Sequence, residues 1–313
     1  MILNLNRFIV CLACVCAMSE PLAWAQPTNN TARPNIVVIL VDDMGWSDIG
    51  SYGGEIPTPN LDALAAKGVR FTQFYNTARC SPSRASLLTG LYPHQAGMGH
   101  LDNIVREGSS GTTGRLNEHC VTMAEVLREA GYFTAMAGKW HLGQQNGTPP
   151  WQRGFDRVLN QRAGGIFFPN QNFQGGGDEL TRRGQEPLYL DGKPIPHDSA
   201  ELGQNWYATY LWTDFGLKFV DEARKANKPF FLYLPHNAPH FPLMAPQELI
   251  GKYRGKYKAG WDRLREERYR RQIKMGLIDA RWPHSPREAE SPAWDSLSAE
   301  EQDRFDHLMA VYA

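Results

Sequence analysis

The chain has 313 residues, and its 33 lysines and arginines are balanced by 33 aspartates and glutamates. A chain of this length has room for one large α/β domain or two smaller ones. The neutral balance leaves no overall positive field to attract phosphates, so we expect no nucleic-acid partner. Aromatic residues make up 11% of the chain and no low-complexity tract interrupts it, which predicts a packed globular domain.

The first 25 residues have the pattern of a secretory signal peptide. Arg7 precedes the apolar run FIVCLACVCAM, and Ala23-Trp24-Ala25 forms an A-x-A cleavage pattern. The run is too short to cross a bilayer, so we expect no stable membrane span. We therefore predict an exported protein, periplasmic or secreted, in which a signal peptide at 1–25 and a polar linker at 26–33 precede a domain at 34–313.

Removal of the signal peptide takes Cys11, Cys14 and Cys16 with it and leaves Cys80 and Cys120. Two cysteines make no disulfide framework, although one pair is arithmetically possible. Cys120 precedes a helical pattern and is expected to be a small buried residue. Cys80 would therefore be an unpaired thiol in an exported protein, and its presence needs an explanation other than a disulfide.

Strand and helix patterns alternate through the first part of the domain. The β-branched run NIVVILV predicts a buried central strand of a parallel sheet at 35–41. The patterns that follow predict a helix at 58–68, a second strand at 69–75, a helix at 81–90 with Pro82 in its first turn, a helix at 121–131 and a strand at 132–138.

The remaining segments continue this alternation. Residues 161–200 are rich in glycine and proline without a clear period, which predicts a long surface excursion. An amphipathic helix at 205–226 and a buried strand at 229–235 follow, and Ser298 caps a last helix. Between 252 and 287, twelve basic residues face four acidic ones, which indicates either a solvated helix face or a rim that attracts anions. We predict an α/β fold with a doubly wound, mostly parallel central sheet flanked by helices.

Polar side chains follow several of the predicted strands, at the edge where such sheets bind ligands. Asp42 and Asp43 come directly after the strand at 35–41. Two adjacent carboxylates repel each other unless a cation lies between them, and Ca²⁺ or Mg²⁺ prefers oxygen ligands. A turn in which both aspartates cap the backbone is the alternative.

Cys80 lies at the start of a predicted helix, where backbone N–H groups and the helix dipole favour an anion. Arg84 lies one turn further along and can point to the same place. The pair indicates a thiolate of low pKa. The alternative is a buried cysteine beside a surface arginine.

Cationic side chains follow two more strands. Lys139 and His141 share a face if the segment is extended, with Trp140 turned toward the core. His240 lies between prolines that stiffen its loop. A lone histidine is more often structural, but here cations, carboxylates and a thiol converge at the same strand ends. This combination suits an anionic oxyester.

The segment CSPSRASLLTG resembles the signature of the type I sulfatases of the alkaline phosphatase-like superfamily, with its C-x-P-x-R core at Cys80, Pro82 and Arg84. NIVVILVDDMGWSDIG, TPNLDALAAKGVRFTQFY, GYFTAMAGKWHLG and HNAPHFPL are similar to further blocks of that family, in the same order. The resemblance runs from Pro34 to the end, and the segment KYRGKYKAGWDRLREERYRRQ is most similar to the bacterial arylsulfatase branch. It implies the alkaline phosphatase-like sulfatase fold and hydrolysis of a small-molecule sulfate ester.

The resemblance also implies a cofactor and a modified residue. Cys80 would be oxidised to Cα-formylglycine by a formylglycine-generating enzyme or an anaerobic maturase. Asp42 and Asp43 would bind Ca²⁺, with Mg²⁺ in second place, and the formylglycine would be a further ligand whose hydrate attacks sulfur. Arg84 would hold that hydrate.

Roles for three more cations come from the same resemblance. His141 would be the base that eliminates sulfate, and Lys139 would bind sulfate and the leaving oxygen. His240 would bind sulfate and protonate the leaving group. His236 is interpreted as structural.

The sequence departs from the family at its C-terminal side. Family members carry a second metal-ligand pair, Asp-Asn after a later strand, and another sulfate-binding lysine, and no strand followed by D-N occurs here after residue 229. We interpret the chain as a C-terminally truncated fragment, from a split gene, a pseudogene or an incomplete gene model, that is inactive alone. The alternatives are a formylglycine-dependent phosphonate monoester or phosphodiester hydrolase and a non-catalytic exported anion-binding protein.

Overall fold

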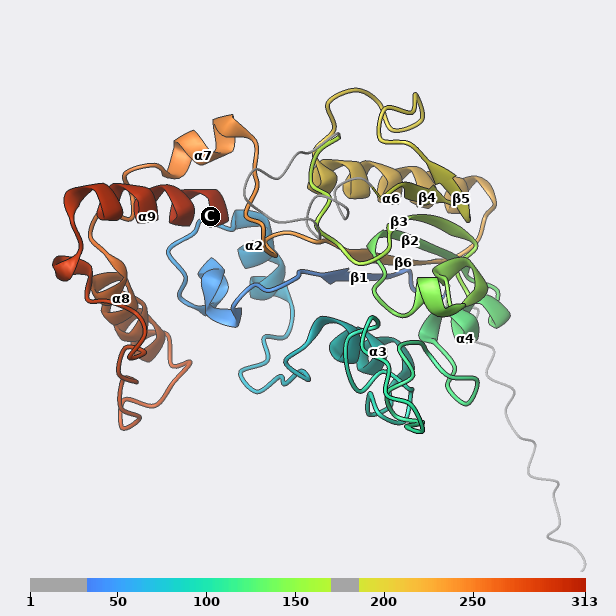
Figure 1. Ribbon diagram of the computed structural model, residues 1–313, viewed down its shortest axis with the longest axis horizontal. Helices are drawn as coiled ribbons and strands as arrows, with labels where there is room; N and C mark the ends of the chain where they lie inside the picture. Colours follow the sequence, from blue (N-terminus) through green and yellow to red (C-terminus); the bar gives the residue numbers. More distant parts are fainter. Residues whose placement is uncertain (1–32, 170–185) are drawn as a thin grey trace, which may run out of the picture. The chain divides into compact units, whose positions relative to one another are not determined.

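A six-stranded sheet forms the centre of the fold in the computed structural model, which describes residues 33–169 and 186–313. The strand order is β1-β6-β2-β3-β4-β5. β1, β6, β2 and β3 pair in parallel, and β4 and β5 add an antiparallel edge (Figure 1). The strands are β1 (Ile36–Leu40), β2 (Phe133–Lys139), β3 (Arg157–Gln161), β4 (Leu188–Leu190), β5 (Lys193–Ile195) and β6 (Phe230–Pro235).

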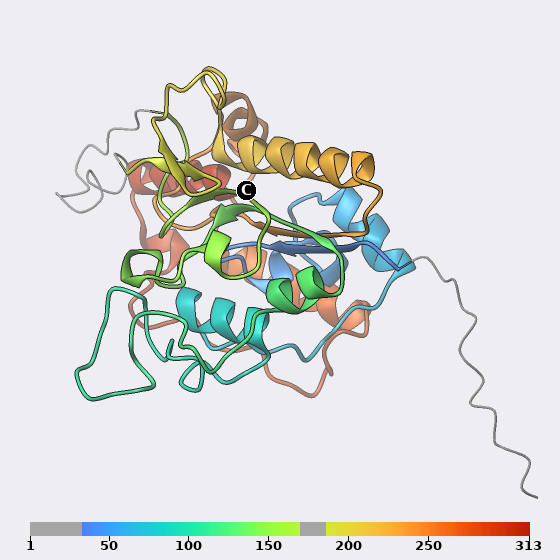
Figure 2. The ribbon, with the colours of Figure 1, turned by 90° about the vertical axis from the view of Figure 1, so that its right-hand side faces the viewer.

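Helices cover both faces of this sheet, as the doubly wound prediction requires. In both views α6 lies on one face, and α3 and α4 lie on the other (Figures 1 and 2). The helices are α2 (Pro59–Lys67), α3 (Cys80–Thr89), α4 (Met123–Glu129), α6 (Ala208–Lys225), α7 (Gln247–Tyr253), α8 (Trp261–Lys274) and α9 (Ala299–Tyr312). The predicted α/β class is confirmed, as are the helices expected at 58–68, 81–90, 121–131 and 205–226 and after Ser298. No helix of the described residues is long and apolar enough to cross a membrane.

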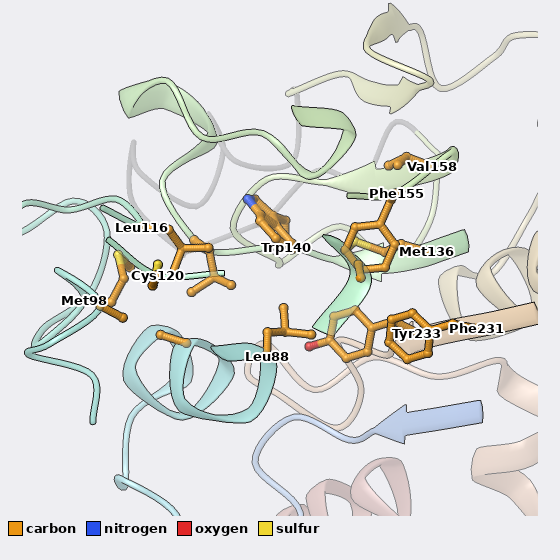
Figure 3. Packing of buried hydrophobic residues seen from close by; sticks show 14 of the residues in the cluster. Leu88, Met98, Leu116, Cys120, Met136, Trp140, Phe155, Val158, Phe231 and Tyr233 are labelled. Atoms are coloured by element: carbon orange, nitrogen blue, oxygen red, sulfur yellow. The ribbon is translucent and has the colours of Figure 1, made fainter. Parts of the chain in front are cut away.

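Each face of the sheet has its own apolar core. Between the sheet and α3, Trp140 packs edge-on against Phe155, and Phe155 stacks on Phe231 and Tyr233 (Figure 3). The other core joins the sheet to the apolar stripe of α6, which includes Trp212, Phe215 and Phe219. The residues that follow the parallel strands are thereby placed at the carboxyl edge of the sheet.

The first strand does not have the predicted central position. β1 pairs with β6 on one side, and among the described residues no strand pairs with its other side. Val37 and Ile39 are 51% and 54% exposed, whereas Ile36, Val38 and Leu40 pack against the core. A run of β-branched residues predicts a strand but does not reveal whether both faces are covered.

Two other sequence predictions are wrong. Residues 69–75 form no strand, because no neighbouring strand offers a ladder and the apolar side chains Val69, Phe71, Phe74 and Tyr75 are exposed. Residues 161–200 are not wholly irregular, since β4 and β5 form a hairpin within them. Its two-residue turn is Asp191-Gly192, both with positive φ, a turn signal visible in the sequence. The predicted signal peptide and almost all of the linker lie outside the described residues.

Candidate active site

Three neighbouring parallel strands, β1, β6 and β2, bring the predicted site residues to one edge of the sheet. Asp42 and Asp43 follow β1, His240 follows β6, and β2 ends in Lys139. The loops after β1 and β6 are joined directly, because the Asp42 N–H donates to the Ala238 carbonyl at 3.2 Å. Residues distant in sequence are therefore held together by main-chain pairing.

A glycine sets the spacing between β2 and β6 just before the site. A Cβ atom on Gly138 would lie 2.0 Å from the carbonyl oxygen of Pro235. Its φ of 137° is also one that side chains of other residues rarely tolerate. The glycine of GKWH therefore allows β2 to deliver Lys139 close to the end of β6.

Asp42 lies between two buried cations. The Lys139 Nζ donates to Asp42 Oδ2 at 2.6 Å, and Arg84 Nη2 lies 3.1 Å from Asp42 Oδ1. The Arg84 guanidinium also donates to the main-chain carbonyl of Lys139 at 2.9 Å. Burial raises the pKa of Asp42, but the charges of Arg84 and Lys139 outweigh it and lower that pKa to about 2. Asp42 is therefore an anion at neutral pH.

Cys80 is the first residue of α3 and is half-buried. Burial raises its pKa, but the neighbouring His141 and the charge of Lys139 lower it overall. Both described cysteines are free, and the buried Cys120 donates through Sγ to the Asn117 carbonyl at 3.2 Å. The two thiols thus have different surroundings, and only Cys80 faces the charged cluster.

The donor atoms of Asp42, Cys80 and His240 lie within 4.8 Å of one another. Asp43 lies beside this group, with its carboxylate 3.6 Å from His240 Nε2 and its side chain 57% exposed. These residues enclose a cavity of about 590 Å³ whose lining also includes Phe74 and Arg79. The carboxylate oxygens of Asp42 and Asp43 suit Ca²⁺, whereas a thiol and an imidazole do not. The site therefore fits Ca²⁺ if an oxygen replaces the Cys80 sulfur and His240 stays outside the ligand set.

The two histidines after β6 have different places. His240 faces the cavity, and cis peptide bonds precede Pro239 and Pro242 on either side of it. His236 lines a separate, largely apolar pocket of about 330 Å³, and burial lowers its pKa to about 4. The structural interpretation of His236 agrees with this placement.

His141 turns the chain sharply after β2. Its φ is 57°, in the left-handed region that residues other than glycine seldom adopt. Asp43 and Ala78, at the other sides of the site, have φ values of 67° and 56°. Such backbone strain persists where the surrounding structure enforces it, and it is enriched at functional sites.

Asp102 was not predicted from the sequence, and the structure places it against His141. The Nε2 atom of His141 lies 3.3 Å from Asp102 Oδ1. Asp102 follows no strand and belongs to no motif that the sequence singled out. A single buried carboxylate in a long loop gives no pattern from which its neighbour could be inferred.

Comparison with known proteins identifies the family. The Sulfatase family profile matches residues 34–311, and the chain belongs to the Sulfatase family. It is 38% identical over 292 residues to an uncharacterized sulfatase of Schizosaccharomyces pombe, covering 90% of this chain and 51% of that protein. It is 36% identical over 307 residues to an arylsulfatase of Klebsiella aerogenes, covering 96% and 63% respectively.

A solved structure supports the same assignment. The crystal structure of Ps i-CgsB in complex with k-i-k-neocarrahexaose is 32% identical, with a TM-score of 0.59, and the match covers 78% of this chain and 53% of that one. The chain thus spans roughly half to two thirds of the length of these relatives.

Proposed function

We propose that the protein hydrolyses sulfate esters of small molecules, in the manner of an arylsulfatase. The observation that carries this proposal is the cluster of Cys80, Asp42 and His240 beside the buried cations Arg84 and Lys139. A reactive side chain surrounded by cations suits an anionic ester, because the cations stabilise negative charge on the group that is transferred.

Formylglycine and Ca²⁺ would complete this chemistry. We expect a formylglycine-generating enzyme or an anaerobic maturase to oxidise Cys80, and the hydrate of the resulting aldehyde would supply the nucleophilic hydroxyl. Asp42 and Asp43 would hold Ca²⁺, together with an oxygen of the modified residue in place of the Cys80 sulfur.

The side chains around Cys80 would bind the ester and move its protons. Lys139 and His240 bind the sulfate oxygens, and His240 donates a proton to the leaving oxygen. His141 accepts a proton from residue 80 as sulfate departs. Arg84 holds the modified residue and keeps a positive charge beside it, since a buried guanidinium stays protonated.

Mass spectrometry of the protein from its own host tests the proposal first. Conversion of the side chain CH₂–SH to CHO removes sulfur and two hydrogens and adds oxygen, so the peptide that contains Cys80 loses mass, whereas the Cys120 peptide does not. An unmodified Cys80 thiol in protein from the native host would contradict the proposal and favour a non-catalytic anion-binding protein.

Turnover by the whole protein provides the second test. We expect Cys80→Ala to abolish hydrolysis of an aryl sulfate and the matched variant Cys120→Ala to retain it, since only Cys80 lies at the site. Faster turnover of an aryl phosphodiester than of an aryl sulfate would instead favour the phosphonate and phosphodiester hydrolases.

We also propose that the protein is exported. The proposal rests on the apolar run and the Ala23-Trp24-Ala25 pattern near the N-terminus. N-terminal sequencing of the mature protein should begin at Gln26, and an intact Met1 on the protein from its native host would contradict export by this route.

A further inference from the structure

We propose that Asp102 is a positioning residue that fixes the tautomer of His141, so that the ring presents its unprotonated Nδ1 atom to residue 80. This inference deepens the proposed function, on which it rests, because a base must carry its lone pair on the side that faces the proton it accepts.

The Asp102 carboxylate is buried and fully engaged. It is 1% exposed, its Oδ1 lies 3.3 Å from His141 Nε2, and its Oδ2 accepts the Gly143 main-chain N–H at 3.3 Å. Burial raises the pKa of Asp102, but its interaction with His141 and the hydrogen bond from the Gly143 N–H lower it overall. The group is therefore ionised at neutral pH and can only accept hydrogen bonds.

The loop that carries Asp102 is tied to the segment that carries His141. The Asp102 main-chain carbonyl accepts from Gln145 Nε2 at 3.2 Å and from Asn146 Nδ2 at 2.9 Å. Asn146 Nδ2 also donates to the Gly114 carbonyl at 2.8 Å. These bonds anchor the main chain at Asp102 to the segment just after His141.

An acceptor at Nε2 determines where the proton of a neutral imidazole lies. The proton is on Nε2, because an ionised carboxylate has none to offer, and Nδ1 keeps the lone pair. In the described residues the buried Nδ1 of His141 has no hydrogen-bond partner, so nothing there competes for that lone pair. The His141 main-chain N–H donates to the Arg162 carbonyl at 2.7 Å, which restrains the backbone that carries the ring.

Asp102→Asn reverses this arrangement with a change of one atom. The Gly143 N–H requires an oxygen at the position of Oδ2, so the amide must place its NH₂ where Oδ1 was. The NH₂ donates to Nε2, and the imidazole proton moves to Nδ1.

Nuclear magnetic resonance of the chain with ¹⁵N-labelled histidine tests this directly. The spectra are recorded at mildly alkaline pH in the Cys80→Ser background, which prevents a thiolate from forming, and His141→Gln assigns the signal. We expect the ¹⁵N resonances of the parent to report protonated Nε2 and unprotonated Nδ1, and those of Asp102→Asn to exchange these positions. Asp306→Asn, at a buried carboxylate remote from His141, should leave the tautomer unchanged.

A parent in which Nδ1 carries the proton would overturn the proposal, and so would an unchanged tautomer in a folded Asp102→Asn protein. If Asp102→Asn does not fold, the tautomer measured in the parent decides on its own whether the proposal holds. Because the measurement needs no turnover, its failure leaves the proposed hydrolysis standing. The expected tautomer in a protein that hydrolyses no sulfate ester would refute only the proposed function.

Discussion

Asp42 has a structural role that can be separated from any role in metal binding. It is the carboxylate that lies between Lys139 and Arg84, and all three side chains are buried. Removing one partner from a buried ionic group leaves charge without compensation, which costs more than the pair itself contributes. Asp43, the next residue, is mostly exposed and does not neutralise buried cations in this way.

We therefore predict that Asp42→Asn and Asp43→Asn differ in stability. Asp42→Asn should lower the free energy of unfolding by about 3–5 kcal/mol, whereas Asp43→Asn should change it by less than about 0.5 kcal/mol. Denaturant unfolding without Ca²⁺ measures both. Equal stability of the two variants would show that Lys139 and Arg84 find other partners.

The residues of the site were predictable where they belong to motifs at strand ends. Asp42, Cys80, Lys139 and His240 each follow or begin a recognisable element, so their convergence could be inferred from the topology. Asp102 could not, because its contact with His141 depends on the path of a long loop. The path of a loop is set by hydrogen bonds between side chains and the main chain, and these bonds produce no periodic pattern in the sequence.

At the scale of elements, β1 alternates between a buried and an exposed face. Val38 packs against the core, while Val37 and Ile39 are exposed, and the strand edge away from β6 has no partner among the described residues. Exposed apolar strand edges promote association between chains. The isolated chain should therefore self-associate.

We predict that the double variant Val37→Lys/Ile39→Lys reduces this association. Light scattering should show fewer aggregates, with the free energy of unfolding within about 0.5 kcal/mol of the parent, because both side chains are on the open face. The matched control Val38→Lys places a charge against the core and should lower the melting temperature. If the double variant unfolded as readily as the control, the assignment of the two faces would be wrong.

Element prediction failed where tertiary context decides. The apolar pattern of 69–75 suits a strand, yet no neighbouring strand in the described chain accepts its hydrogen bonds. The hairpin of β4 and β5 was not predicted, although Asp191-Gly192 is a typical hairpin turn sequence. The many glycines and prolines around it indicated an irregular segment instead. Long amphipathic helices such as α6 were predicted well, because a single apolar stripe along the helix is enough to indicate how it packs.

At the scale of the whole molecule, the basic segment at 252–287 is largely paired. Arg268 contacts both Glu55 and Asp48 at 2.7 Å, and Arg287 contacts Asp262 at 2.8 Å. The first two pairs join α8 to the segment that follows β1. This arrangement favours a solvated, ion-paired helix over a rim that attracts anions.

The proposed metal ligands determine how tightly the described residues would hold Ca²⁺. Ca²⁺ takes roughly six to eight oxygen ligands, and among the described residues the proposed ones are Asp42, Asp43 and residue 80. We predict that Ca²⁺ binding measured by calorimetry is weak. Tight binding would contradict this expectation.

The bonds that Asn146 makes have a consequence for how the protein is produced. Asn146-Gly147-Thr148 is an acceptor sequence for N-linked glycosylation in eukaryotic secretion. A glycan is attached at Nδ2, the atom that donates to both the Asp102 and Gly114 carbonyls. One hydrogen would then have to serve two acceptors that are now each satisfied. Material from a glycosylating host should therefore contain a sugar-bearing fraction in which the loop at Asp102 is loosened, and Thr148→Ala would prevent the modification.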